Sequence, residues 1–475
     1  MIELEDISIV EEKISQSMLD EAPGTQEGQK LPQYLVTLSV GIVVISGGTT
    51  IGWTSLVMAY LTSPDSPFTL TKDQASWTGS LLPIGAFFGA ILAGPIANII
   101  GQKLAILSTG LPLALSWLLI FTARSVTWLF IARFVAGIGL GAACALVPTY
   151  ISEIAEKSVR GVFGTAFQLS LVFGIVYAYV TGAVLCYNNL SIACGILPLL
   201  FFLAFSQAPE SPMYLLRRNK KIQAEKSLRT LRGNKYNVSK ELSDIEKEIV
   251  NQEKTKVSFF QAVFNRTSVR ALTICLGLMV FQQISGINIV TFYSASIFKD
   301  AGSSLKPEYA TIIVGVAQLV ATIPSSLLVD KAGRKMLLQL SSLVMAISLW
   351  ALGFYFLMKD RGNDVSSYSW IPLMSVVVYI IFFSVGFGPI PWIMTAEIFP
   401  QEIKAVGCGL AVVVNWTMVF AVTKLFQPLL FYIGTAYTFW LFGSATFVGL
   451  AFVFFLVIET KGKSLGQIQT ELCGK

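Results

Sequence analysis

Two long stretches of this chain carry no charged residue. Residues 34–59 and 161–206 contain no Asp, Glu, Lys or Arg, and a membrane-spanning helix needs only about 20 apolar residues. Charged residues make up 13% of the 475 residues and apolar residues 54%, whereas soluble domains average about 25% charged residues. These features predict a helical protein that crosses a membrane several times, and they exclude a disordered chain.

The residue types that are missing narrow the chemistry. The chain contains no histidine, which excludes His-based metal sites, Ser–His–Asp hydrolysis and imidazole proton relays. Its six cysteines form no CxxC pair and lie mostly in apolar runs, so we interpret them as small buried side chains. A net charge of +6 reflects loop bias in a membrane protein and does not indicate a nucleic-acid partner. We therefore expect no metal and no cofactor.

Twelve apolar segments follow a polar N-terminal tail. The acidic composition of residues 1–33 predicts a disordered tail, and it lacks the basic and apolar regions of a signal peptide. The expected spans are 34–59, 75–99, 103–122, 127–153, 161–187, 189–207, 268–298, 308–329, 334–358, 370–399, 403–432 and 436–458. This organisation predicts two six-helix halves, 34–207 and 268–458, and a C-terminal tail, 459–475.

The segment between the halves, residues 208–267, is charged. Its leucines and isoleucines recur at roughly helical spacing and predict short amphipathic helices. Residues 213–270 hold 14 of the 34 basic residues, and basic loops stay on the cytoplasmic side of a membrane. With six spans on either side of this linker, both termini are also expected in the cytoplasm, and the plasma membrane is the expected location.

The two halves repeat one another weakly. Residues 98–103, after the second span, resemble residues 330–335, after the eighth span. Glu210 follows the sixth span as Glu459 follows the twelfth. Internal repeats of this kind are typical of transporters whose substrate site lies at mid-membrane between the halves.

The strongest polar cluster lies in the seventh span. Gln282, Gln283 and Asn288 lie within seven residues of one another, and Ser285-Gly286 between them favours local unwinding of the helix. Carboxamides both donate and accept hydrogen bonds without carrying charge, which suits a neutral polyhydroxy ligand. Hydrogen bonding between helices is the alternative interpretation, since lone polar residues often serve that purpose in membranes.

The tenth span is interrupted by glycine and proline. Gly386, Gly388, Pro389 and Pro391 predict a broken or kinked helix next to Trp392. An aromatic face with an indole N–H is a good partner for a sugar ring, and a packing tryptophan at a kink is the alternative. Weaker single candidates lie in the fifth, eighth and eleventh spans: Gln168, Gln318, Asn415 and Trp416.

Together these motifs resemble the sugar porters of the major facilitator superfamily over residues 34–465. The resemblance is closest to insect facilitated trehalose and glucose transporters, through residues 52–55 and the eighth span. The matching elements are Arg133-x3-Gly137-x-Gly139-x-Gly141, Pro148-x-Tyr150-x2-Glu153, Arg160-Gly161, Pro209-Glu210-Ser211-Pro212, Gln282-Gln283-Ile-Ser285-Gly286-Ile-Asn288, Asp330-x2-Gly333-Arg334-Lys335, Gly388-Pro389-Ile-Pro391-Trp392, Glu397-x-Phe399-Pro400 and Glu459-Thr460-Lys461-Gly462.

The resemblance implies both a fold and a set of functional residues. The fold is all-α, with twelve spans and cytoplasmic linker helices. The implied sugar site comprises Gln168, Gln282, Gln283, Asn288, Phe383, Ser384, Trp392, Asn415 and Trp416, and we add Gln318. The implied gating network comprises Arg133, Glu153, Arg160, Glu210, Asp330, Arg334, Glu397 and Lys404. We expect the charges at the cytoplasmic ends of the spans to pair only when that side closes.

Some positions depart from the family pattern. After the second span, Asn98, Ile99 and Gln102 replace the acid and the basic residues, so the network in the first half should be weaker. Proton-coupled porters carry an acid in the first span, where this chain has Thr50. The sequence therefore predicts transport without proton coupling.

We thus expect a monomeric transporter that moves a neutral sugar through the bilayer by alternating access. A glucose-type hexose and trehalose both remain open as the substrate. The alternatives are a proton-coupled sugar symporter and a sugar sensor that binds without transport. An enzyme is not expected, because the spans contain no paired catalytic acids, nucleophile–base pair or metal site.

Overall fold

The computed structural model describes residues 28–63, 66, 69–156, 159–233, 236–254, 265–302, 305–400, 403–463 and 465–473. Most of the predicted N-terminal tail, residues 1–27, and residues 255–264 of the linker lie outside these ranges. The described residues form helices and contain no β-strand. Twelve helical segments are long and apolar enough to cross a membrane, which confirms the predicted fold class.

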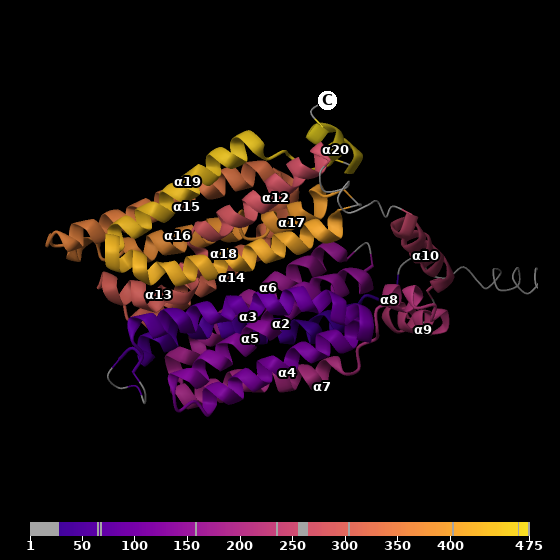
Figure 1. Ribbon diagram of the computed structural model, residues 1–475, viewed down its shortest axis with the longest axis horizontal. Coiled ribbons are helices and arrows are strands. Elements are labelled where there is room, and N and C mark those ends of the chain that lie inside the picture. Colours follow the sequence, from indigo (N-terminus) through magenta and orange to yellow (C-terminus); the bar gives the residue numbers. More distant parts are fainter. Residues whose placement is uncertain are drawn as a thin grey trace, which may run out of the picture.

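The helices form two bundles that lie side by side (Figure 1). The first bundle, called the N-half here, consists of α2 (Leu31–Leu61), α3 (Lys72–Ile100), α4 (Gln102–Phe121), α5 (Val126–Ile154), α6 (Arg160–Val184) and α7 (Tyr187–Phe205). The second bundle, the C-half, consists of α12 (Arg266–Ile284), α13 (Ile287–Ala301), α14 (Pro307–Ala332), α15 (Arg334–Asp360), α16 (Ile371–Val385), α17 (Ile390–Ile398), α18 (Lys404–Ile433) and α19 (Thr435–Leu456). A 3-10 helix, Ser366–Tyr368, precedes α16.

Four short helices gather at one end of the bundles. These are α8 (Pro212–Arg217), α9 (Lys221–Arg232), α10 (Val238–Lys254) and the C-terminal α20 (Leu465–Cys473), at the right of Figure 1. The first three confirm the amphipathic linker helices predicted from the sequence. We call this end of the molecule the linker end and the opposite end the far end.

Small residues allow helices to approach closely inside the N-half. A Cβ atom on Gly137 of α5 would lie 2.1 Å from the carbonyl oxygen of Leu82 in α3. A Cβ atom on Gly141 would lie 2.0 Å from the carbonyl oxygen of Ala86. Both distances are far below van der Waals contact, so only glycine permits this backbone packing, as is common between membrane helices.

The linker is fixed to the N-half through Arg232. Its guanidinium Nη1 donates to the carbonyl oxygen of Ile154 at 2.8 Å, and Nη2 donates to Glu241 at 2.8 Å. The backbone N–H of Gln29 donates to the carbonyl oxygen of Arg232 at 2.8 Å, and the side chain of Gln33 is fully buried. Residues 28–33, which precede the first predicted span, thus contact α9 and the segment that follows α5.

The predicted internal repeat appears as matching helix starts. Glu210 accepts the backbone N–H of Lys103 at 3.0 Å, at the beginning of α4. Glu459 accepts the backbone N–H of Arg334 at 3.0 Å, at the beginning of α15. Each carboxylate satisfies a donor that no helical carbonyl can reach and faces the positive end of the helix dipole.

The two halves are joined at the far end. There the Ser55 hydroxyl accepts the backbone N–H of Ala295 at 3.1 Å, which links α2 to α13. Tyr179 donates its hydroxyl to the carbonyl oxygen of Thr291 at 2.7 Å, which links α6 to α13. A further set of bonds links α3 to α18. The far end of the transmembrane bundle is therefore closed in this structure.

Candidate functional site

Two broken helices meet inside the C-half. One break separates α12 from α13 at Ser285 and Gly286, where Gly286 has φ +89°. The second break separates α16 from α17 at residues 386–389. Both breaks were predicted from glycine and proline in the sequence, and both are confirmed. Each break releases backbone carbonyl groups that need hydrogen-bond partners inside the membrane.

Polar side chains from neighbouring helices satisfy these carbonyl groups. Tyr379 donates its hydroxyl to the carbonyl oxygen of Ser285 at 3.0 Å. Gln282 donates from Nε2 to the carbonyl oxygens of Phe387 and Gly388, at 2.6 and 3.0 Å. The Gln282 carboxamide therefore ties the seventh span to the broken tenth span.

Four carboxamides form a connected group, which we call the carboxamide cluster: Gln282, Gln283, Asn288 and Asn415. Gln282 Oε1 accepts from Gln283 Nε2 at 3.0 Å and from Asn415 Nδ2 at 2.9 Å. Gln283 Oε1 in turn accepts from Asn288 Nδ2. Three of the four are buried and Asn288 is half-buried. The structure thus brings together residues from the seventh and eleventh spans that the sequence indicated separately.

The members of the cluster differ in the hydrogen-bonding capacity that they retain. Gln282 uses both its N–H groups, on two carbonyls, and both acceptor positions, on two amides. Gln283 uses one N–H group and one acceptor position, and Asn288 uses one N–H group. A primary amide offers two donors and two acceptor lone pairs. Gln283 and Asn288 therefore keep donors and acceptors for a ligand, whereas Gln282 is committed to the protein.

The other predicted site residues lie on the two parts of the broken tenth span and on α18. Phe383 is buried, and its ring lies against the position of Gly388, where a Cβ would meet the ring Cε1 at 3.3 Å. Ser384 donates to the carbonyl oxygen of Ile380 in its own helix at 2.7 Å. Trp416 carries a buried indole N–H that has no partner among the described residues, and Trp392 is 40% exposed.

The two remaining predicted polar residues lie on other helices. Gln168 is half-buried in α6, and Gln318 is buried in α14. In the part of the chain that the structure describes, no recorded hydrogen bond joins either side chain to the carboxamide cluster.

The predicted gating charges of the C-half already contact one another. Arg334 Nη2 lies 3.1 Å from Asp330 Oδ1 and 2.9 Å from Glu397 Oε1. The Thr460 hydroxyl also donates to Glu397, at 2.5 Å. All these residues belong to the C-half or follow it, so their contacts lie within one bundle. The expectation that such charges pair only when the linker end closes stays a prediction. These pairs fix α14, α15 and α17 to each other within one bundle.

The predicted gating residues of the N-half have different surroundings. Glu210 caps α4, as described above. Glu153 is half-buried near the end of α5, and Lys404 is half-buried at the first position of α18. Arg160 begins α6, but its side chain lies outside the described atoms. A shared gating role of these residues stays a prediction.

Arg133 does not belong to the linker-end charges. It lies in the far half of α5 and is fully buried. Its Nη1 donates to the carbonyl oxygen of Thr50 at 2.7 Å, and its Nη2 donates to the Thr54 hydroxyl at 2.6 Å. Its Nε donates to the carbonyl oxygen of Thr78 at 3.2 Å, and the ring of Trp53 lies 5.1 Å from the guanidinium carbon. Arg133 therefore joins α2, α3 and α5 through neutral acceptors.

Asp73, Trp77 and Lys424 form a further group at the far end that was not predicted from the sequence. Lys424 Nζ lies 2.8 Å from Asp73 Oδ1 and 4.2 Å from the centre of the Trp77 ring. Lys424 interrupts an otherwise apolar run of α18. A lone charge inside a predicted span is costly and marks a functional position, and that signal could have found it.

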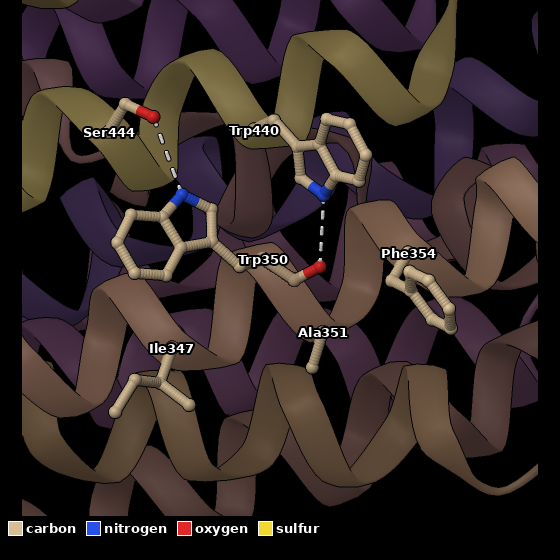
Figure 2. Close-up of a pocket in the computed structure, with 6 residues that line it drawn as sticks. All are labelled: Ile347, Trp350, Ala351, Phe354, Trp440 and Ser444. Carbon is tan, nitrogen blue, oxygen red and sulfur yellow. Dashed lines mark hydrogen bonds between the residues drawn. The ribbon is translucent and has the colours of Figure 1, made fainter.

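A surface groove lies elsewhere. It has a volume of about 560 Å³ and runs between α15 and α19 (Figure 2). Trp350 donates its indole N–H to Ser444 at 3.4 Å, and Trp440 donates to the carbonyl oxygen of Trp350 at 3.1 Å. Ile347 and Phe354 are exposed at its rim. This apolar groove faces outwards and does not include the carboxamide cluster.

Comparison with known proteins identifies the family. Residues 40–472 match the family model described as "Sugar (and other) transporter". The chain belongs to this family. It is therefore a multi-pass membrane protein of a transporter family, built on the major facilitator fold.

Named relatives and solved structures agree with this assignment. The chain is 39% identical over 459 residues to the facilitated trehalose transporter Tret1 of Bombyx mori, covering 95% of this chain and 90% of the relative. It is 38% identical over 445 residues to the Tret1 of Apis mellifera ligustica, covering 93% and 88%. A partially occluded inward open structure of the xylose transporter XylE from E. coli has a TM-score of 0.77 at 24% identity, covering 91% and 99%. The likeness to XylE shows the shared fold.

Proposed function

We propose that this protein carries out facilitated transport of a neutral sugar by alternating access. The carboxamide cluster at the two broken helices is the observation that carries the proposal. Gln283 and Asn288 retain uncharged donors and acceptors beside a helix break, and sugar hydroxyls need both kinds of partner. Substrate sites at discontinuous helices near mid-membrane are typical of transporters built from repeats.

Trehalose is the first substrate to test, and a glucose-type hexose is the second. The relatives at 38–39% identity are named facilitated trehalose transporters, which supports the disaccharide. The site itself supports either sugar, because both are neutral and polyhydroxylated. Trp392 and Trp416 would offer aromatic faces to a sugar ring.

The proposed orientation places the linker end in the cytoplasm. The linker region, residues 213–270, holds 14 of the 34 basic residues, and the positive-inside rule favours this side. With the halves joined at the far end, the structure then corresponds to an inward-facing state in the plasma membrane. The opposite state requires the far-end contacts to separate and the linker end to close.

Proton coupling is the main alternative, and the surroundings of Arg133 argue against it. Coupling needs a buried group that binds and releases a proton during the cycle, and such groups are rare in spans. Helix α2 contains no acid, and Arg133 contacts the backbone carbonyl of Thr50 where a symporter would place a carboxylate. We therefore propose uniport.

The proposal is tested by counterflow in proteoliposomes. Vesicles loaded with unlabelled trehalose should transiently accumulate labelled trehalose, because a carrier exchanges substrate across the bilayer. The same assay with glucose ranks the two substrates. Binding of sugar without counterflow would indicate a sensor. If neither trehalose nor glucose shows binding or counterflow, the proposal is contradicted.

A further inference from the structure

Lys424 makes its polar contacts with the opposite half of the molecule. It lies on α18 of the C-half, whereas Asp73 and Trp77 lie on α3 of the N-half. Its ammonium group lies 2.8 Å from Asp73 Oδ1 and 4.2 Å from the Trp77 ring centre. The backbone of the same residue takes part as well, since Ser76 donates its hydroxyl to the carbonyl oxygen of Lys424 at 3.3 Å.

This group differs in kind from the hydrogen bonds recorded between the halves in the described part of the chain. The links through Ser55 and Tyr179 are hydrogen bonds from neutral groups, and the link between Thr423 and Ser80 spans 3.4 Å. The Lys424–Asp73 contact is an ion pair that is reinforced by a cation–π contact, and the lysine side chain is only 22% exposed. A partly desolvated cation loses more than a neutral hydroxyl when its partners move away.

Alternating access separates these partners. When the far end opens, α3 and α18 move apart, and Lys424 loses both the carboxylate and the aromatic ring. The interaction therefore stabilises only the state in which the far end is closed. An interaction whose free energy differs between two states shifts the ratio of their populations.

We propose that Asp73, Trp77 and Lys424 form a far-end latch that sets the ratio of inward-facing to outward-facing protein. This inference rests on the proposed alternating-access function and adds the residues that set its conformational balance. Because Asp73 is 76% exposed, we expect the ion pair to change the ratio by about two- to fivefold, the range typical of partly exposed pairs.

Opening of the far end can be measured without transport. Ser80 lies in α3 close to the latch and is fully buried, so a thiol at this position reacts only when the halves separate. The Ser80→Cys protein, purified in detergent, is treated with a soluble thiol reagent, and the label on the peptide containing the substitution is followed by mass spectrometry. This background is then combined with Lys424→Met, Asp73→Asn, Trp77→Leu and the Lys424→Met/Asp73→Asn double variant.

The expected result is non-additive. Lys424→Met keeps the apolar stem on Trp77 and removes the charge, and it should raise the labelling rate about two- to fivefold. Asp73→Asn should give a similar increase in the labelling rate. The double variant should label at about the same rate as either single variant, because each single substitution already removes the same ion pair. Trp77→Leu should also raise the rate.

A matched control uses an exposed cation at the far end. Arg361 caps the C-terminal end of α15 in the C-half and is exposed. In the described part of the chain no recorded side-chain contact joins it to the N-half, so Arg361→Met should leave the labelling rate unchanged. Unchanged labelling in Lys424→Met, or additive effects in the double variant, would overturn the latch. Because labelling needs no sugar, a failure here is distinguishable from a failure of the transport proposal.

Discussion

Glu459 accepts the backbone N–H of Arg334 at 3.0 Å, and Glu210 makes the matching contact with Lys103 at 3.0 Å in the other half. Glu459 also accepts the backbone N–H groups of Lys335 and Lys461, at 3.0 and 2.9 Å. Burial would raise the pKa of this carboxyl, but the backbone donors outweigh burial and hold its pKa below the ordinary value of 4.5. The ionised form thus stabilises the start of α15.

The first prediction concerns this carboxylate and pH. Because the folded pKa of Glu459 is lowered, its stabilisation is fully present above pH 4.5 and is lost as the pH falls through the folded pKa. Glu459→Gln should reduce stability by about 0.5–2 kcal/mol at pH 7, the range for charges at helix ends. Thermal unfolding at pH 7 and at pH 4 provides the measurement. If the difference in melting temperature between the wild type and Glu459→Gln is as large at pH 4 as at pH 7, this role of the carboxylate is contradicted.

The second prediction concerns Arg334. Its pairs with Asp330 and Glu397 lie within the C-half, so we expect them to persist in both states of the proposed cycle. Arg334→Ala should lower the melting temperature, mainly through the loss of the charged hydrogen bond to the partly buried Glu397, worth about 1.5–3 kcal/mol. The pair with the 75% exposed Asp330 should add at most about 1 kcal/mol. The exposed Arg361 provides a control, since Arg361→Ala should have little effect. A large change in the labelling rate of Ser80→Cys in the Arg334→Ala background would show that this arginine controls the conformational balance instead.

The third prediction concerns the buried Arg133. Its planar guanidinium reaches acceptors on α2 and α3 at the same time, and the single ammonium group of lysine cannot reproduce that fork. Arg133→Lys should therefore destabilise the N-half by about 1–3 kcal/mol, because buried acceptors are left unpaired. Arg124→Lys, at an exposed loop position, is the matched control. Equal melting temperatures for both variants would refute this role of Arg133.

The sequence predicted the fold because a long uncharged apolar segment in a membrane has to satisfy its backbone hydrogen bonds internally, as a helix does. It also predicted both helix breaks, since Gly286 and Pro389 cannot continue a regular helix. It did not predict which carboxamide uses all its hydrogen-bonding groups on the protein. The N–H partners of Gln282 are backbone carbonyls more than 100 residues away in the chain.

The charged residues were harder to place from the sequence. A motif fixes the type of residue but not its depth in the membrane, and Arg133 lies far from the linker-end charges with which it was grouped. The role of Lys424 could not be predicted from local sequence, because its partners lie on α3, in the other half of the chain. Long-range pairing of this kind depends on how the two bundles meet, which local patterns do not encode.

The fourth prediction separates binding from support within the carboxamide cluster. Gln283→Ala and Asn288→Ala should each raise the apparent transport constant for the sugar about three- to tenfold, since each removes a neutral hydrogen bond of about 0.5–1.5 kcal/mol. Gln282→Ala should instead lower the melting temperature, because two buried carbonyls lose their donor.

Gln339 provides the control for this series, since its carboxamide lies beside a surface groove on α15. Gln339→Ala should change neither the transport constant nor the melting temperature. Sugar affinity that stays at the wild-type value in both Gln283→Ala and Asn288→Ala would exclude the cluster as the binding site.

Facilitated transport without proton coupling is the central claim, and one gradient experiment tests it directly. Proteoliposomes are equilibrated with labelled trehalose on both sides, and a pH gradient is then imposed across the membrane. Because α2 has no acid and Arg133 contacts only neutral acceptors among the described residues, the internal sugar concentration should stay equal to the external one while exchange continues. Accumulation of sugar against its own gradient, abolished by a protonophore, would contradict the account.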